Sequence, residues 1–241
     1  MVDDFLLAFA RIAPIVAIHP VFGGRSVPRT VAVMLAVAMA LASSASGHVP
    51  AHEAGLPFVA ALAREVVSGA AIGLVGVAVF GTIEAAGRLV DDARGVGFAA
   101  LYDPLVEAPT SPIGQLDLYA AVALFWSLGL HAGLFAAVAS DFNAPEVGTS
   151  SLERVAAVAG TLARAGLALG GPAAATCAAV DLLVGFAGRS APQANLLPLG
   201  LTVKLLAALL VTAAAMPARA RVWAEMWVEH LRWISAIVGS A

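Results

Sequence analysis

Long apolar runs separated by polar stretches are the feature that most constrains how this chain can fold. The runs cover about residues 5–22, 31–42, 66–86, 118–139, 155–187 and 193–216. A helix needs about 20 apolar residues to cross a hydrocarbon core roughly 30 Å thick, so most of these runs can span a membrane. Charged residues make up 12% of the 241 residues, about half the roughly 25% usual in soluble domains. The sequence therefore predicts an all-α, polytopic membrane protein.

Composition and motifs argue against several other classes of protein. The formal net charge is −3 and there is no long Lys/Arg run, which argues against nucleic-acid binding. The single cysteine, Cys177, excludes an internal disulfide and a cysteine zinc cage. His52-Glu53 begins a zinc-protease motif, but Leu56 stands where its second histidine belongs, and no phosphate-binding or nucleophile-elbow motif occurs. We expect no enzyme activity, no catalytic residues, no bound metal and no cofactor.

Prolines and short runs predict that the hydrophobic helices are broken. Gly170-Gly171-Pro172 lies in the middle of the fifth run, and Pro14 and Pro198 interrupt the first and last. Beyond residue 216, apolar side chains share one helical face, which is typical of a helix that lies on a membrane interface or packs on a partner. These side chains are Trp223, Met226, Trp227, Ile234 and Ile237. We expect about six broken helices arranged as hairpins over residues 1–216, and an amphipathic helix over 217–241.

Ionisable residues inside the apolar runs are candidates for function. Each isolated one costs roughly 2.5 to 3.5 kcal/mol at the centre of a bilayer, so most must face protein or water. They fit either a polar conduit or ion pairs that fix assembly, and the charges alone do not choose between the two. The residues are Arg11, His19, Glu84, His131, Arg164, Asp181 and Lys204.

Alternating charges from Glu84 to Arg94 form a ladder at helical spacing. Glu84 and Arg88 are four residues apart, and Asp91 and Arg94 are three apart. One interpretation is a self-neutralised helix end, and the other is a charged surface that contacts a partner or a passing substrate. Gly87 would allow a close backbone approach, and Gly95 would end the helix in a left-handed cap. Small-residue Gly-x-x-x-Gly pairs beginning at Gly69, Gly129 and Gly166 predict close helix packing.

Three segments in order resemble the FliR/SctT family, the export-gate subunit of type III secretion systems. The segments are Pro20 to Arg29; Ala86 to Gly95 followed by Asp103-Pro104, Ser111-Pro112 and Gly114; and Asp181, Gly185 and Arg189-Ser190-Ala191-Pro192-Gln193-Ala194-Asn195 with Lys204 downstream. The Arg-x-Ala-Pro-Gln-x-Asn turn with its downstream lysine is the most specific part. Gly87-x-x-x-Asp91-x-x-Arg94-Gly95, followed by Asp-Pro and Ser-Pro, resembles the injectisome branch more than the flagellar one.

This resemblance implies a bacterial inner-membrane protein that is a structural, non-enzymatic part of a protein-export channel. Its implied partners are SctR-like, SctS-like and SctU-like subunits and, transiently, unfolded secretion substrates. The alternative function is a small secondary transporter that uses Asp181, Lys204 and His131. The candidate residues for assembly or the export path are Glu84, Arg88, Asp91, Arg94, Asp103, Pro104, Asp181, Arg189, Pro192, Gln193, Asn195 and Lys204.

The geometry of the last hairpin makes one specific prediction. Pro192 restricts the residue before it to extended conformations, which fixes a turn between two helices. Counted outward from that turn, Asp181 and Lys204 lie at levels that differ by roughly 6 Å at 1.5 Å per helical residue. We therefore predict that Asp181 pairs with Lys204 across the hairpin instead of with Arg189.

Overall fold

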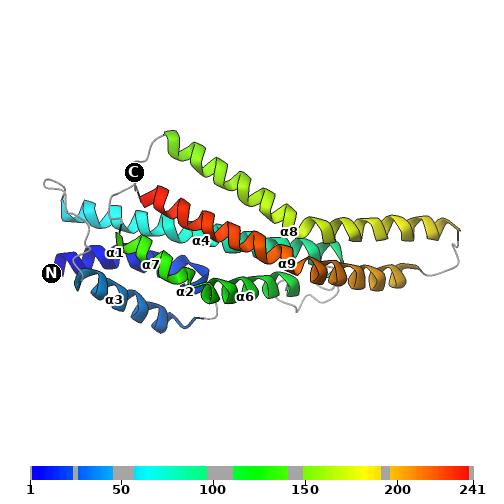
Figure 1. Cartoon of the computed structure of the whole chain (residues 1–241), viewed down its shortest axis with the longest axis horizontal. Helices are drawn as coiled ribbons and strands as arrows, with labels where there is room; N and C mark the ends of the chain where they lie inside the picture. The colour runs from blue at the N-terminus through cyan, green and yellow to red at the C-terminus, as the bar shows by residue number, and fades with distance from the viewer. Residues whose placement is uncertain are drawn as a thin grey trace. The chain divides into compact units, whose positions relative to one another are not determined.

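The computed structural model describes residues 2–23, 27–45, 57–96, 111–140, 149–190 and 196–238. All regular structure in these ranges is helical, as Figure 1 shows, so the predicted all-α fold is confirmed. The helices are α1 (Val2–Ile18), α2 (Pro20–Gly23), α3 (Arg29–Ala45), α4 (Phe58–Ala93), α6 (Pro112–Ser127), α7 (Leu130–Ser140), α8 (Thr149–Ser190) and α9 (Leu196–Val238).

Several helices are long and apolar enough to cross a membrane. By length and composition, Phe58–Ala93, Ala156–Ser190 and Pro198–Ile234 each qualify alone. The pair Pro112–Ser127 and Leu130–Ala136 qualifies together and is bent by 71° at the break between its members. The 17-residue α3 is apolar but shorter than these spans. The protein is therefore a multi-pass membrane protein.

The helix breaks do not fall where the prolines predict them. Pro14 lies inside α1, and the first run breaks at His19 instead. Pro198 falls in the first turn of α9, where a backbone N–H has no helical partner to lose. The fourth run breaks before Leu130, where Gly129 has a φ of 69°.

The predicted break at Gly170-Gly171-Pro172 is wrong, because α8 runs unbroken from Thr149 to Ser190. A β-carbon on Gly170 would lie 2.6 Å from the carbonyl oxygen of Ala86 in α4, so the two helices touch backbone to backbone here. One turn beyond the proline, the hydroxyl of Thr176 donates to the carbonyl of Pro172 at 2.8 Å. Packing of Gly170 on α4 therefore holds the helix together although Pro172 lacks a backbone donor.

The chain divides into two compact units, and α4, α6, α8 and α9 contribute residues to both. Unit 1 comprises Met1–Phe80, Val122–Val158 and Met226–Ala241. Unit 2 comprises Gly81–Ala121 and Ala159–Glu225. The predicted boundary at 216/217 falls inside α9, which continues across it. The division into 1–216 and 217–241 stays a prediction.

In unit 1, α1 packs against α3 and α4 through small residues and one ion pair. The face of α3 toward the interior carries Ala36, Ala40 and Ser43. A β-carbon on Gly69 of α4 would collide with the backbone carbonyl of Arg11, so the predicted glycine packing is present. Arg11 Nε donates to Glu65 Oε2 at 2.6 Å with both side chains buried. This pair explains how a charge sits inside the first apolar run.

A buried cluster of aromatic rings and histidines completes unit 1. His19 packs within 5.6 Å, between ring centroids, of both Phe80 and His230. Trp227 lies 6.3 Å from Phe80, so the C-terminal part of α9 is buried in the chain that carries it. His19 Nδ1 accepts the Val21 N–H at 3.3 Å and caps α2, which begins with a proline at its first position. Burial and the neighbouring His230 lower the pKa of His19 to about 3.

Candidate functional site

The end of α4 in unit 2 carries the first candidate site. The chain leaves the helix through Gly95, whose φ of 89° is the left-handed conformation that the sequence predicts. Gly95 N–H donates to the carbonyl of Asp92 at 3.1 Å, and Val96 N–H donates to that of Asp91 at 3.0 Å. This pair of bonds is a Schellman motif, which satisfies two carbonyls that have no partner within the helix.

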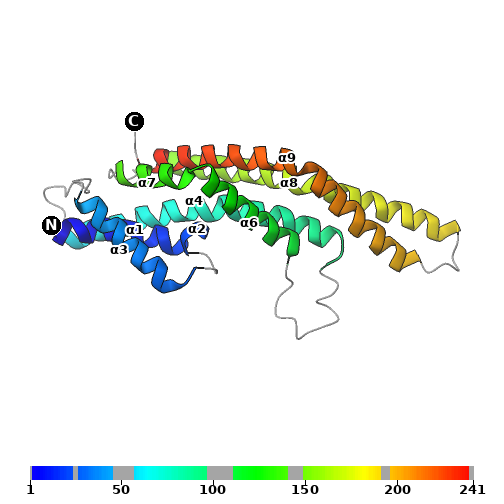
Figure 2. The ribbon, with the colours of Figure 1, turned by 60° about the horizontal axis from the view of Figure 1, so that its bottom comes forward.

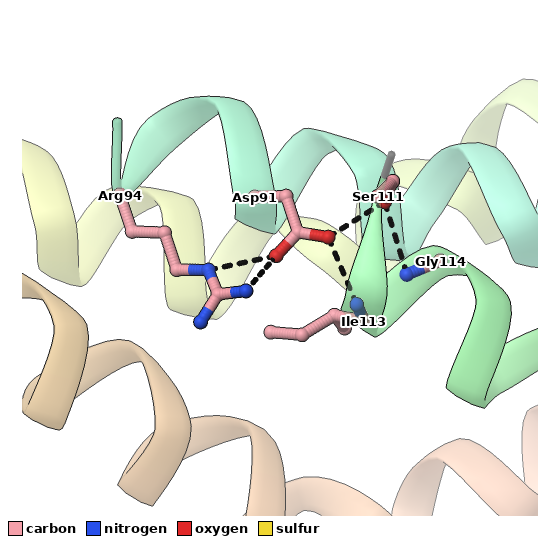
Figure 3. Close-up of polar contacts among 5 residues, drawn as sticks. All are labelled: Asp91, Arg94, Ser111, Ile113 and Gly114. Carbon is pink, nitrogen blue, oxygen red and sulfur yellow. Dashed lines mark hydrogen bonds and ion pairs between the residues drawn. The ribbon is translucent and has the colours of Figure 1, made fainter. Parts of the chain in front are cut away.

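The Asp91 side chain joins α4 to the start of α6 (Figure 3). Its Oδ2 accepts hydrogen bonds from Ser111 Oγ at 2.6 Å and from the Ile113 N–H at 2.9 Å. Its Oδ1 accepts from Arg94 Nε at 2.7 Å, and Arg94 adds a second contact through Nη2. Ser111 Oγ in turn accepts the Gly114 N–H at 3.1 Å. One carboxylate, 1% exposed, thus neutralises Arg94 and helps to cap a second helix.

Two glycines let α4 and α6 approach closely where the two helices cross. Figure 2 shows the crossing of the two ribbons. A β-carbon on Gly87 would lie 2.6 Å from the Gly114 Cα, and one on Gly114 would lie 2.8 Å from the carbonyl oxygen of Glu84. Neither position has room for a side chain larger than hydrogen. The predicted close approach at Gly87 is therefore present, and it places Ser111 within reach of Asp91.

A second buried ion pair in unit 2 joins α6 to α9. Arg219 Nη2 binds Asp117 Oδ2, and the guanidinium carbon lies 5.8 Å from the centroid of the Trp223 ring. The three residues are 1% to 3% exposed. No sequence pattern signals this pair, because its members are 102 residues apart. Only the position of Asp117 at the edge of an apolar run could have suggested a buried partner.

The predicted charge ladder separates into a buried part and an exposed part. Asp91 and Arg94 contact each other and are nearly buried, with side chains 2% and 7% exposed. Glu84 and Arg88 pair at 3.6 Å, with side chains 37% and 57% exposed. The ladder is therefore not one continuous surface: Asp91 and Arg94 face the interior, whereas Glu84, Arg88 and Asp92 are accessible.

The predicted pairing across the α8–α9 hairpin is present in the structure. Lys204 Nζ donates to Asp181 Oδ2 at 2.9 Å. The Lys204 side chain is 11% exposed, whereas that of Asp181 is 59% exposed. Arg189, near the end of α8, is exposed.

Other candidates lie outside the described residues or apart from this site. Among them, Asp103, Pro104, Pro192, Gln193 and Asn195 fall in segments that the structure does not describe. His131, in unit 1, packs its ring 4.5 Å from Trp126, between ring centroids. Among the described residues, no group of three His, Cys, Asp or Glu side chains gathers to hold a metal ion. The charged residues described above in unit 2 are instead held in ion pairs.

Membrane-crossing helices whose charges are paired within the chain define a multi-pass membrane protein. Comparison with known sequences identifies its family. A sequence model described as "Bacterial export proteins, family 1" matches residues 2–230. The chain belongs to this family of export-apparatus proteins.

Individual relatives agree with this assignment. The chain is 25% identical to the flagellar biosynthetic protein FliR of Bacillus subtilis, over 98% of this chain and 95% of the relative. It is 24% identical to FliR of Escherichia coli, over 95% of this chain and 90% of the relative. It is 34% identical to the Yop proteins translocation protein T of Yersinia pestis, over 32% of this chain and 30% of the relative. The resemblance to the FliR/SctT family is confirmed, and the protein is a component of a protein-export apparatus.

Proposed function

We propose that this chain is a structural subunit of a type III secretion export gate. In this proposal it assembles with SctR-like and SctS-like subunits into the channel through which unfolded proteins cross the bacterial inner membrane. A SctU-like subunit contacts the assembled gate. The observation that carries the proposal is the family match over residues 2–230, which leaves no large part of the described chain for another activity.

The structure supports a role in assembly in preference to catalysis. Two charge pairs in unit 2, Asp117–Arg219 and Asp181–Lys204, join helices to one another, and Asp91 joins α4 to α6 through its hydrogen bonds to Ser111 and Ile113. The alternative of a secondary transporter needs Asp181 and Lys204 available to an ion or a substrate. Lys204 is bound to Asp181 Oδ2 and is nearly buried, so the lysine is not open to a substrate, and no specific observation favours transport.

We assign the chain to the injectisome branch on its Gly87-x-x-x-Asp91-x-x-Arg94-Gly95 segment, which ends α4 and meets Ser111. This segment contains the side chains that join α4 to α6. The Yersinia relative supports the injectisome branch over a third of the chain, and the flagellar relatives align over nearly all of it.

Deletion of the gene, with complementation, tests the function and the branch together. We expect loss of secreted effector proteins, unchanged effector levels inside the cell and normal swimming motility. Loss of motility with normal effector secretion would move the protein to the flagellar branch. Normal secretion and normal motility would reject the proposal. A tagged copy should also co-purify from detergent with the other gate subunits.

A further inference from the structure

The α8–α9 hairpin of unit 2 exposes many large apolar side chains. In the most apolar 18-residue stretch of each helix, 28% is buried in α8 and 11% in α9, against 44% in α4. Leu182 and Phe186 are 66% and 65% exposed. Lipid chains or another protein must cover this surface in the membrane.

One side of α8 presents a charge within this apolar surface. Ala178, Asp181, Leu182 and Gly185 follow the i, i+3, i+4, i+7 spacing of a single helical face, and all four are exposed. We call this set the Asp181 face. A β-carbon on Gly185 would meet nothing within 4 Å, so the space in front of the face is open.

The carboxylate of Asp181 is only half satisfied. Lys204 Nζ binds its Oδ2 from the buried side, and Oδ1 has no partner among the described residues. Asp91, in contrast, uses both of its oxygens within the fold. A carboxylate can accept several hydrogen bonds, and the side chain is 59% exposed, so Asp181 keeps acceptor capacity that another molecule can reach.

We infer that the Asp181 face receives a membrane-spanning helix of another gate subunit, and that this helix donates a hydrogen bond to Asp181 from a lysine or arginine side chain. This inference rests on the proposed function and adds to it the surface and the chemistry of the partner. Complementarity between an exposed acceptor and a donating side chain is the argument for this occupant.

Lipid and a second copy of this chain fit the face less well. A carboxylate facing lipid is costly near the bilayer centre, and the Lys204 contact offsets only part of that cost. The hydroxyls of Thr176 and Thr202 on the same hairpin already donate to carbonyls of their own helices, as lipid-facing hydroxyls can. A symmetric contact between two copies would bring two Asp181 carboxylates together, which repel each other.

Site-specific photo-crosslinking in cells that carry the whole apparatus tests the face directly. A photoreactive residue replaces Leu182 on the Asp181 face or, as the matched control, Leu183, which points about 100° further round the helix and is equally exposed. We expect a crosslink from position 182 to a gate subunit, at a helix with a donor side chain, and little from position 183. A crosslink from 182 to lipid or to a second copy of this chain would overturn the inference.

The isosteric variant Asp181→Asn tests the chemistry. The asparagine oxygen can still accept from Lys204, but its NH2 group replaces the outward acceptor with a donor. We expect the variant to co-purify roughly tenfold less partner, because about one charge-assisted hydrogen bond is lost. The control Thr176→Val should co-purify like the original chain.

The two proposals fail in different ways. Normal co-purification by Asp181→Asn, with the original chain also binding its partners, would overturn this inference and leave the proposed function intact. An original chain that co-purifies with no other gate subunit would reject the proposed function itself. If Asp181→Asn fails to accumulate, the crosslinks from position 182 decide the inference.

Discussion

Asp91 and Asp181 are both aspartates on long apolar helices of unit 2, and both bind a basic side chain, yet their surroundings differ. Asp91 is 1% exposed and accepts hydrogen bonds from three residues at the end of α4 and the start of α6. Asp181 has a side chain 59% exposed and a single partner, Lys204, among the described residues. A fully used, buried carboxylate fixes the fold, whereas a half-used, exposed one remains available for assembly. The same type of residue can therefore serve either purpose, and its number of partners distinguishes them.

The largest expected effect comes from removing the buried carboxylate of Asp91. Asp91→Ala removes the acceptor for Ser111, Ile113 and Arg94 and leaves a guanidinium unpaired in a nearly buried position. Removing one partner of a buried ion pair costs about 3–5 kcal/mol. We expect the variant to accumulate poorly in membranes and to melt early in detergent, as followed by tryptophan fluorescence. Asp92→Ala is the matched control, because Asp92 is exposed. Equal melting of the two variants would contradict the assigned role.

The crossing of α4 and α6 should respond to a single methyl group. Gly114→Ala places a β-carbon 2.6 Å from Ser111 Oγ and 2.8 Å from the carbonyl oxygen of Glu84. Overpacking of this kind costs typically about 1–3 kcal/mol. Gly160→Ala on α8 meets nothing within 4 Å and should stabilise the helix by roughly 0.5–1 kcal/mol. Thermal melting of both purified variants should show shifts of opposite sign, and shifts of the same sign would contradict the close crossing.

Reversing the charges of Asp181 and Lys204 separates the role of their ion pair from the role of the exposed carboxylate. Asp181→Lys with Lys204→Asp rebuilds an ion pair across the hairpin but turns the exposed acceptor into a donor. We expect the double variant to recover the abundance lost by either single variant, within about 1 kcal/mol of the original stability. Secretion should stay low, because the partner helix still loses its acceptor. Full recovery of secretion would mean that the pairing alone matters and that the outward oxygen does not.

The smallest effect is expected at the exposed end of the ladder. Arg88→Gln removes a 3.6 Å contact to Glu84 between two solvent-accessible side chains. Exposed ion pairs of this kind contribute at most about 1 kcal/mol. We expect unchanged abundance and melting temperature. Secretion measured in the same strain then reports on partner contact alone, since folding is unaffected. A large loss of stability would show that Arg88 has a structural role like that of Asp91.

Much of the helical layout could be predicted because it depends on local sequence. Apolar runs located the helices, and the glycines at 87 and 95 were correctly interpreted as a close approach and a left-handed cap. The Asp181–Lys204 pair was predictable because a short turn fixes the register of two neighbouring helices.

The remaining features depend on contacts between distant segments. Pro172 did not break α8, because packing of Gly170 on α4 overrides the local preference. Asp117 meets Arg219 only after four helices of unit 2 have come together, so no spacing in the sequence signals it. The division of the charge ladder likewise follows from where α6 crosses α4, which periodicity does not indicate.

The histidine and aromatic cluster of unit 1 has a consequence for biosynthesis. His19 and Phe80 are made well before Trp227 and His230 of α9, which contact them. Domains generally fold as units, so this cluster is complete only after α9 has been made. A chain that stops before Trp227 therefore leaves the rings of His19 and Phe80 without these neighbours.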